Sequence, residues 1–222
     1  MAGGWRVWIS PPRSHCRRAC ERAPKQVKDW LEQRYPKLKR RAKRGGAKIF
    51  LLDEAGFQSA PSLGRTDGLK GHPPGVETSG QRQRLNVISA GNARGEFGAA
   101  TYAGKLAAEA FVQFLKDFRK RQGGTICLVL DGLAAHKAKL VRRYPATLDG
   151  RLELHPLPPY CPALNPDEFV WSHMKNNGAS KKPLKQNESL RKRVEEDLVQ
   201  IHGNSRLVRS FFGAASVGYA GD

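Results

Sequence analysis

Two periodicities of apolar residues along the chain predict a mixed sheet flanked by helices. Short apolar runs are typical of buried strands, whereas apolar residues spaced three and four apart indicate a helix with one buried face. The predicted strands are 48–52, 84–90, 97–102, 125–130 and 152–155, the second and third joined as a hairpin through 91–95. The predicted helices are 24–44, broken or restarted at Pro36, then 107–121, 134–143, 166–177 and 188–202.

This element order predicts an α/β fold, because an apolar strand with helices on either side of it in the sequence is typical of a sheet covered on both faces. Ligands of such sheets gather near the carboxyl ends of the central strands. Asp53 follows the strand 48–52, and Asp131 follows the strand 125–130. We therefore expect both carboxylates at the same edge of the sheet.

A third carboxylate, Glu168, comes at a helix start after the proline-rich stretch 157–166. Magnesium prefers oxygen ligands and keeps positions open for water and phosphate, so a few carboxylates suffice to hold it. Asp53, Asp131 and Glu168 are therefore the predicted metal ligands and catalytic residues of a phosphoryl-transfer site.

Each of these acidic residues also has a simpler interpretation. Glu54 is as acidic as Asp53, and since side chains alternate faces along a strand, only one of the two can point into a given site. Asp131 could cap the helix that follows it. Glu168 could complete a capping box with Asn165, an arrangement that would fix the helix start and leave the carboxylate within reach of a metal.

The charge balance favours nucleic acid as the partner. The chain carries 39 Lys and Arg against 20 Asp and Glu, a formal net charge of +19, and such a field concentrates polyanions. An apolar run long enough to span a membrane is missing, which disfavours a membrane partner. The four cysteines lack a second pair at zinc-binding spacing, so we expect reduced thiols in a cytosolic protein.

The basic segment 37–44 carries six cations and no anion. Like charges on adjacent helical turns repel, and a bound polyanion would relieve that repulsion. The segment 58–84 is rich in Gly, Pro, Ser and Thr, and its length without periodicity is typical of a functional or mobile loop. The residues expected to contact DNA are Lys37, Lys39, Arg40, Arg41, Lys43, Arg44, Arg65, Lys70, Arg82, Arg84, His136, Lys137 and Lys175.

Three blocks of sequence resemble the signatures of a known enzyme family. They are 53–57 (DEAGF), 128–131 (LVLD) with His136 five residues on, and 157–168 (LPPYCPALNPDE). The chain resembles DDE transposases, specifically the bacterial insertion-sequence branch of the Tc/mariner superfamily, and the spacing from Asp131 to Glu168 agrees with that branch. The likeness extends over roughly 17–219.

The resemblance implies a ribonuclease H-like catalytic domain over 47–222, preceded by a basic helical arm over 1–46. It implies that Asp53, Asp131 and Glu168 bind two Mg²⁺ or Mn²⁺ ions, and that the enzyme cleaves DNA and transfers strands during transposition. The implied partners are transposon ends and target DNA, with a homo-oligomer in the active complex. The implied location is the bacterial cytoplasm, at the nucleoid.

Two features depart from the family pattern. Gly132 stands where the family usually has Asn, which removes a side-chain hydrogen-bond partner near the metal. The chain starts too late to hold the helix-turn-helix units that family members carry ahead of the catalytic domain. Two alternatives stay open, a host nuclease of the ribonuclease H or Holliday-junction type and a catalytically dead, basic DNA-binding remnant.

Overall fold

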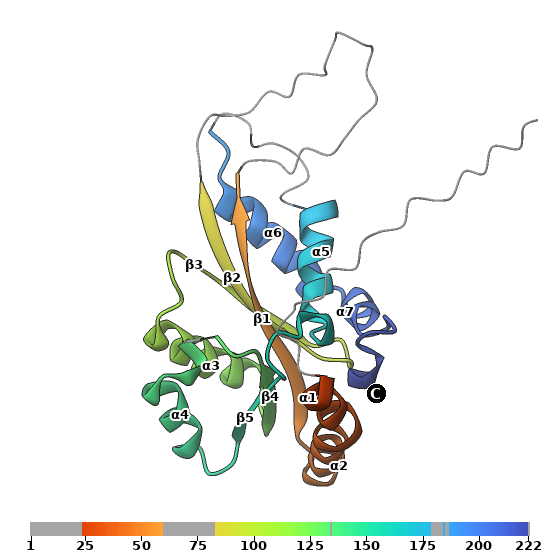
Figure 1. The fold of residues 1–222 in the computed structure, drawn as a ribbon. Coiled ribbons are helices and arrows are strands. Elements are labelled where there is room, and N and C mark those ends of the chain that lie inside the picture. The colour runs from red at the N-terminus through yellow and green to blue at the C-terminus, as the bar shows by residue number, and fades with distance from the viewer. Residues whose placement is uncertain (1–23, 60–82, 134, 179–183, 185–186, 222) are drawn as a thin grey trace, which may run out of the picture.

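A five-stranded mixed sheet forms the centre of the computed structural model, in the order β3-β2-β1-β4-β5 (Figure 1). The structure describes residues 24–59, 83–133, 135–178, 184 and 187–221. Strands β1, β2 and β3 pair antiparallel, whereas β1, β4 and β5 run parallel. The strands are β1 (Lys48–Gln58), β2 (Arg84–Gly91), β3 (Phe97–Tyr102), β4 (Ile126–Leu130) and β5 (Leu152–Pro156).

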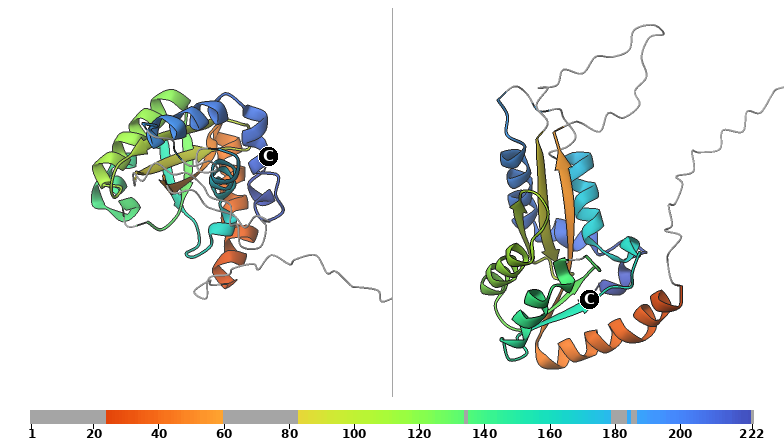
Figure 2. Two further views of the ribbon diagram at one scale, coloured as in Figure 1. Left: turned by 90° about the horizontal axis from the view of Figure 1, so that it is seen from above. Right: turned by 60° about the vertical axis from the view of Figure 1, so that its left-hand side comes forward.

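Helices lie on both faces of this sheet, as the sequence predicted (Figure 2). The α-helices are α1 (Pro24–Asp29), α2 (Tyr35–Gly45), α3 (Ala108–Gln122), α4 (Lys139–Ala146), α5 (Asp167–Asn177), α6 (Leu190–His202) and α7 (Ser205–Phe211). A π-helical segment (Trp30–Arg34) joins α1 to α2, and short 3₁₀ turns form at Ala135–Lys137, Pro162–Leu164 and Gly218–Ala220. Within the described segments, no helix is both long and apolar enough to cross a membrane.

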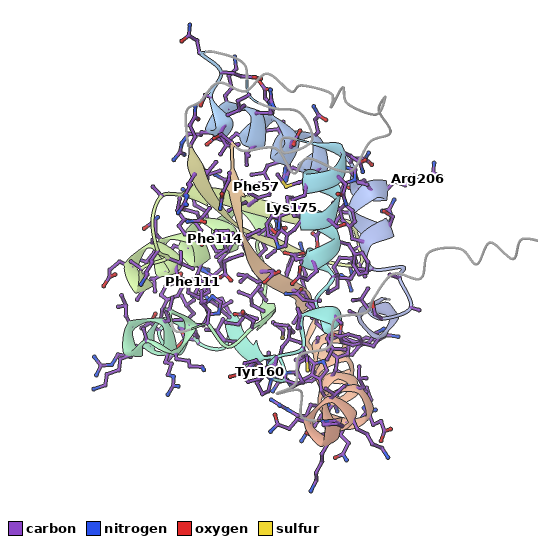
Figure 3. All side chains as sticks on the ribbon, turned by 45° about the horizontal axis from the view of Figure 1, so that its top comes forward. Phe57, Phe111, Phe114, Tyr160, Lys175 and Arg206 are labelled. Atoms are coloured by element: carbon purple, nitrogen blue, oxygen red, sulfur yellow. The ribbon has the colours of Figure 1, made fainter. Side chains whose placement is uncertain are left out.

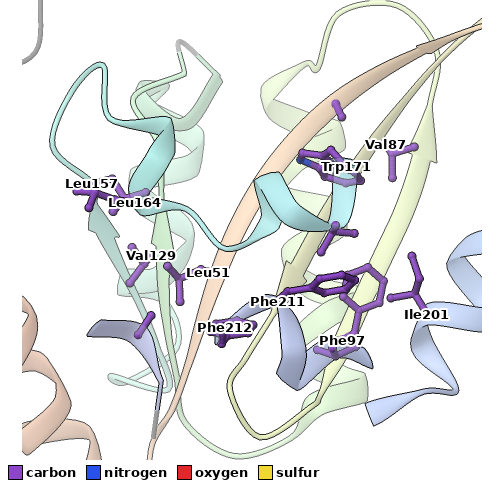
Figure 4. Packing of buried hydrophobic residues seen from close by; sticks show 14 of the residues in the cluster. Leu51, Val87, Phe97, Val129, Leu157, Leu164, Trp171, Ile201, Phe211 and Phe212 are labelled. Atoms are coloured by element: carbon purple, nitrogen blue, oxygen red, sulfur yellow. The ribbon is translucent and has the colours of Figure 1, made fainter. Parts of the chain in front are cut away.

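Alternation along β1 divides the hydrophobic core into two layers. Phe50 and Leu52 face α3 and α4, in a cluster that includes Phe111. Leu51 and Phe57 face the other way, in the larger cluster with α2, α5, α6 and α7, part of which Figure 4 shows around Leu51 and Trp171. The sheet is therefore buried on both faces, and any residue of β1 faces either the α3 layer or the α5 layer.

Helices α1 and α2 pack into the larger cluster rather than standing apart from it. Trp30, Tyr35 and Leu38 are all buried there. Pro36 falls in the first turn of α2 and has no backbone N–H to donate, and the residues before it, Trp30–Arg34, form a π-helical segment in place of a regular α-helix. The predicted domain boundary between residues 46 and 47 stays a prediction.

Sequence patterns located most elements but misjudged three. Strand β1 continues to Gln58, so Asp53 lies inside it and not at its end, because β2 pairs with β1 beyond the part paired with β4. The expected helix 134–143 splits into a 3₁₀ turn and α4. Helix α7 was not foreseen, because seven residues are too short to establish a period.

Candidate active site

Asp53 and Asp131 meet because of the register between β1 and β4. The last parallel pair of the two strands is Leu51 with Val129, and continuing that register by two residues brings Asp53 level with Asp131. Asp131 follows the carboxyl end of β4 directly. The strand pairing therefore brings together two carboxylates that are far apart in the sequence.

Glu168 reaches the same place through the loop between β5 and α5. The Asn165 side chain donates a hydrogen bond of 2.9 Å to the backbone oxygen of Leu52, which ties this loop to the residue before Asp53. Only half of the capping box considered above forms: the Asn165 Oδ1 accepts a 3.2 Å hydrogen bond from the Asp167 N–H, whereas the Asn165 N–H donates to the Pro162 oxygen and not to the Glu168 side chain. Glu168 lies in the first turn of α5 and takes no part in such a cap.

A cavity of about 380 Å³ is lined by all three predicted ligands, Asp53, Asp131 and Glu168. Gly132, Leu133 and Lys137 form part of its wall, and the loop 157–162 forms much of the rest. A larger cavity of about 600 Å³ lies between β3, α3 and α6 and contains none of the predicted ligands. The smaller cavity is therefore the candidate active site.

The Asp53 carboxylate lies in an environment of this cavity that disfavours its ionised form. Burial, followed by the negative charge of Glu168 and that of Glu54, raises the pKa of Asp53 to about 7. The Trp171 Nε1–H donates a 2.9 Å hydrogen bond to Asp53 Oδ2, which opposes the rise and fixes the orientation of the carboxylate. Trp171 itself is held edge-on against Phe57 in the core. Among the residues that the structure describes, no cation forms an ion pair with Asp53, so its carboxylate is held in place as a metal ligand would be.

Glu54 points to the opposite face of β1 and forms an ion-paired cluster with His136. The His136 Nε2–H donates to Glu54 Oε1 at 2.7 Å, and Nδ1 lies 3.1 Å from Asp131 Oδ1. Burial by itself lowers the pKa of His136, but the two carboxylates outweigh burial and raise that pKa to about 9. The imidazole is therefore protonated at neutral pH. It is also buried against the Phe111 ring, at a centroid distance of 4.4 Å.

Asp131 takes part both in the candidate active site and in the ion-paired cluster of His136, since it lines the cavity and also contacts His136. Its partial burial raises its pKa, but hydrogen bonds from His136 and from the Leu133 backbone N–H prevail and leave the pKa below its usual value. Asp131 therefore stays ionised at neutral pH, and two donors fix its orientation.

Asp167, the neighbour of Glu168, is an acidic residue that sequence reasoning did not single out. It is fully buried, accepts a 2.7 Å hydrogen bond from Ser89 Oγ, and burial raises the pKa of its carboxyl well above the usual value. Burial therefore favours the neutral form of the Asp167 carboxyl. The run Asp167-Glu168 could have signalled two acids with different roles, but sequence alone does not reveal which one is buried.

A second acidic and histidine cluster lies under α2, away from the cavity. Cys127 of β4 and Glu153 and His155 of β5 place their ligand atoms within 4.8 Å of one another. The Arg41 guanidinium forms an ion pair with Glu153 and lies 3.4 Å from His155 Nε2. A cation from the protein thus already compensates this cluster.

The predicted DNA contacts divide into several groups. Arg65, Lys70 and Arg82 lie outside the described residues. Lys37, Arg40, Lys43, Arg44, Arg84, Lys137 and Lys175 are exposed. Arg41 pairs with Glu153, and Lys39 donates to the Gly221 backbone oxygen, so both attach α2 to the body of the protein. His136 departs from the expectation, because it is buried and both ring nitrogens contact carboxylates.

Comparisons with known proteins agree with this geometry. Residues 48–191 match the family model described as DDE superfamily endonuclease. No curated protein matches the sequence. Solved structures of similar fold include three of the Mos1 transposase. The Mos1 strand transfer complex has a TM-score of 0.69 at 16% identity over 95% of this chain and 64% of the other. The Mos1 mariner paired end complex with Mn has 0.67 at 15%, over 95% and 65%.

The third is the catalytic domain of Mos1 mariner transposase, with a TM-score of 0.54 at 15% identity over 91% of this chain and 97% of the domain. The chain spans a little under two thirds of the Mos1 chains in the two complexes. At these identities the likeness establishes the ribonuclease H-like fold, whereas the family match covers more than half of the sequence. The chain belongs to the DDE superfamily of endonucleases.

Proposed function

We propose that this chain performs the metal-dependent DNA cleavage and strand transfer of a transposase of the bacterial insertion-sequence branch of the Tc/mariner superfamily, acting at the bacterial nucleoid. The observation that carries the proposal is that Asp53, Asp131 and Glu168, from two strands and a helix, line one cavity in a DDE endonuclease fold. Similarity to Mos1 strand transfer and paired end complexes supports it.

The donor set of the cavity fits divalent metal. All three side chains offer oxygen ligands. The pKa of Asp53 is raised by burial first and by the charges of Glu168 and Glu54 second, and a bound cation would favour the ionised carboxylate against both. We propose that Asp53, Asp131 and Glu168 hold two Mg²⁺ or Mn²⁺ ions. Such ions activate an attacking water or DNA 3′-hydroxyl and stabilise the leaving oxygen.

The remaining groups of the site orient these ligands and the DNA. The Trp171 N–H holds Asp53, and the protonated His136 holds Asp131. Lys137 is exposed on the cavity wall, where its ammonium group can contact a phosphate next to the carboxylates. The exposed cations of α2, together with Arg84 and Lys175, are proposed to contact the DNA backbone, and the active complex is proposed to be a homo-oligomer.

Two other functions are compatible with the same three carboxylates. A host nuclease would cleave DNA through the same carboxylates but would not join strands. A catalytically dead remnant would bind DNA without cleaving it. Neither has an observation in its favour that the transposase proposal lacks.

The test measures nicking of supercoiled plasmid with Mg²⁺, and joining of a labelled donor 3′ end to target DNA. We expect both activities in the parent protein and neither in Asp131→Asn, which keeps the shape of the side chain while removing its charge. Cleavage without joining would identify a nuclease. Binding without cleavage would identify a remnant, and cleavage by Asp131→Asn at the parent rate would show that Asp131 is not a metal ligand.

A further inference from the structure

Cys127, Glu153 and His155 bring three different kinds of ligand atom together under α2. In the parallel register of β4 and β5, Cys127 lies level with Glu153, and His155 follows two residues along β5 on the same face of the sheet. Their sulfur, oxygen and nitrogen atoms lie within 4.8 Å of one another. The cluster shares no residue with the cavity of the candidate active site, whose wall carries Tyr160, labelled in Figure 3. The proposed DNA chemistry therefore does not account for these three side chains.

The Arg41 guanidinium lies at the point on which these ligand atoms converge. One of its nitrogens, Nη2, forms the ion pair with Glu153 Oε2 and also lies 3.4 Å from His155 Nε2. The guanidinium hydrogen-bonds the Cys127 side chain as well. A single cation of the protein thus contacts all three side chains, so a metal ion at the same point would be within reach of all three.

The spacing of the cluster suits a tetrahedral metal. Zinc binds sulfur at about 2.3 Å and nitrogen or oxygen at about 2.0–2.2 Å, which places neighbouring ligand atoms roughly 3.3–3.7 Å apart. His155 Nε2 and Glu153 Oε2 are 3.0 Å apart, and the Cys127 sulfur lies within 4.8 Å of both. The side chains of Glu153 and Arg41 are 36% and 52% exposed, so both have room to rotate. A small rotation of Glu153 and the departure of Arg41 would complete the site.

The donor set selects the class of metal. Thiolate and imidazole ligands favour Zn²⁺, whereas Mg²⁺ and Ca²⁺ prefer oxygen ligands alone. Burial lowers the pKa of His155, so its imidazole is neutral at neutral pH, the form that binds metal. Burial also raises the pKa of the Cys127 thiol, and a metal that binds the sulfur releases the thiol proton to solvent.

We propose that Cys127, Glu153 and His155 form a zinc site, in which Zn²⁺ takes the place of the Arg41 guanidinium. Three protein ligands leave the fourth tetrahedral position to water. Binding breaks the ion pair of Arg41 with Glu153, so the guanidinium and the metal compete for the same carboxylate. The site goes beyond the proposed function, since it takes a softer metal and uses none of the predicted catalytic residues.

The experiment titrates the full, reduced chain with Co²⁺ and with Zn²⁺, in excess Mg²⁺ to occupy sites made of oxygen ligands. A cobalt–thiolate bond gives a near-ultraviolet charge-transfer band, and calorimetry measures the Zn²⁺ affinity. The parent should show the band. Cys127→Ser should lose it and bind Zn²⁺ more than about 100-fold more weakly, beyond the effect of a group outside the ligand shell. Cys161→Ser is the matched control, since it replaces another buried free cysteine and should keep both.

Arg41→Ala tests the competition, because it removes the guanidinium and leaves all three ligands in place. Zn²⁺ should bind this variant about two- to fivefold more tightly than the parent, the effect of one exposed ion pair. His155→Gln keeps the sulfur and should bind Zn²⁺ more than about 100-fold more weakly, which repeats the test should Cys127→Ser fail to melt cooperatively. A parent without the band, a band of parent intensity in Cys127→Ser, or equal or weaker Zn²⁺ binding in Arg41→Ala would overturn the site.

Discussion

Asp53 and Glu54 are neighbours in β1, yet they enter different surroundings. Glu54 faces the α3 layer, where the protonated His136 neutralises it at 2.7 Å. Asp53 faces the α5 layer, where burial and then the charge of a second carboxylate, Glu168, raise its pKa to about 7. A compensated carboxylate holds the structure together, whereas an uncompensated one is ready to bind a cation.

Of the substitutions considered, Asp53→Asn should have the largest effect on DNA nicking. Loss of a charged ligand should reduce Mg²⁺-dependent nicking by more than about 100-fold, beyond the 10- to 100-fold typical of groups outside the ligand shell. The same variant should be more stable than the parent at pH 8 without metal, because it removes a buried carboxylate that is costly to ionise. Nicking and thermal melting measure the two effects, and a destabilised variant that still cleaves DNA would contradict the assignment.

Glu54→Gln tests the carboxylate whose charge His136 neutralises. Removing one partner of a buried ion pair costs about 3–5 kcal/mol of stability, and the loosened His136 should reduce nicking by about 10- to 100-fold through Asp131. Glu153→Gln is the matched control, since this partly exposed carboxylate pairs with His155 and Arg41 away from the cavity, and its stability loss should stay below about 1 kcal/mol. If Glu54→Gln reduced nicking more than Asp53→Asn, the two residues would have to exchange roles.

The pH dependence should separate the two clusters. A metal must displace the proton of Asp53, so Mn²⁺ affinity should rise about tenfold per pH unit up to about 7 and then level off. Without metal, the folded state holds this proton more tightly than the unfolded state, so Asp53 lowers stability as pH rises from about 4 to 7. His136 acts oppositely, because its raised pKa gives stability that is present below about 6.5 and is lost as pH rises through about 9.

Calorimetric Mn²⁺ titrations of the parent and Asp53→Asn, from pH 5.5 to 8, measure the first effect. The variant should bind weakly at every pH in this range. A parent affinity independent of pH would show that Asp53 does not exchange a proton for metal.

Helix α2 also carries one charge that is neutralised by an ion pair and one that is not, and the expected effects of replacing them are smaller. Arg41 is neutralised by Glu153, whereas no ion pair of Arg40 occurs among the described residues. Arg40→Ala should flatten the log–log salt dependence of DNA binding by about 0.9, the value for one phosphate contact. Arg41→Ala should leave the slope unchanged and lower the melting temperature. Equal effects of the two variants on the slope would place Arg41 on DNA as well.

Gly132→Asn should have the smallest effect, an increase in nicking of about two- to tenfold, the gain expected from one added hydrogen-bonding side chain near the ligands. A Cβ at this position would meet only the flexible Lys137 side chain, Nζ at 3.6 Å and Cε at 3.8 Å, both ordinary contact distances. Gly132→Ala is the control, since it adds the Cβ without the amide and should leave the rate unchanged. A rate increase in Gly132→Ala equal to that in Gly132→Asn would assign the effect to the backbone.

Local sequence patterns predicted the elements that carry the site. Continuous apolar residues marked β4, and the 3.6-residue period marked α3, because both signals depend only on neighbours in the chain. The rule that Asp53 and Glu54 face opposite sides of a strand was also correct. The role of His136 was missed, since its two carboxylate partners lie five residues before it and across the sheet on β1.

By itself, the sequence determined the kinds of element, the acidic residues that they carry and the positive charge, since these follow from residue types and spacing along one chain. Only the tertiary structure decided which charges are compensated. Pairing of β1 with β4 brings Asp53 to Asp131, packing of α5 puts Glu168 beside Asp53, and the turn after β4 delivers His136 to Glu54. A carboxylate becomes a ligand or an ion-pair partner through its burial and its nearest charge, and both are set by contacts between segments distant in sequence.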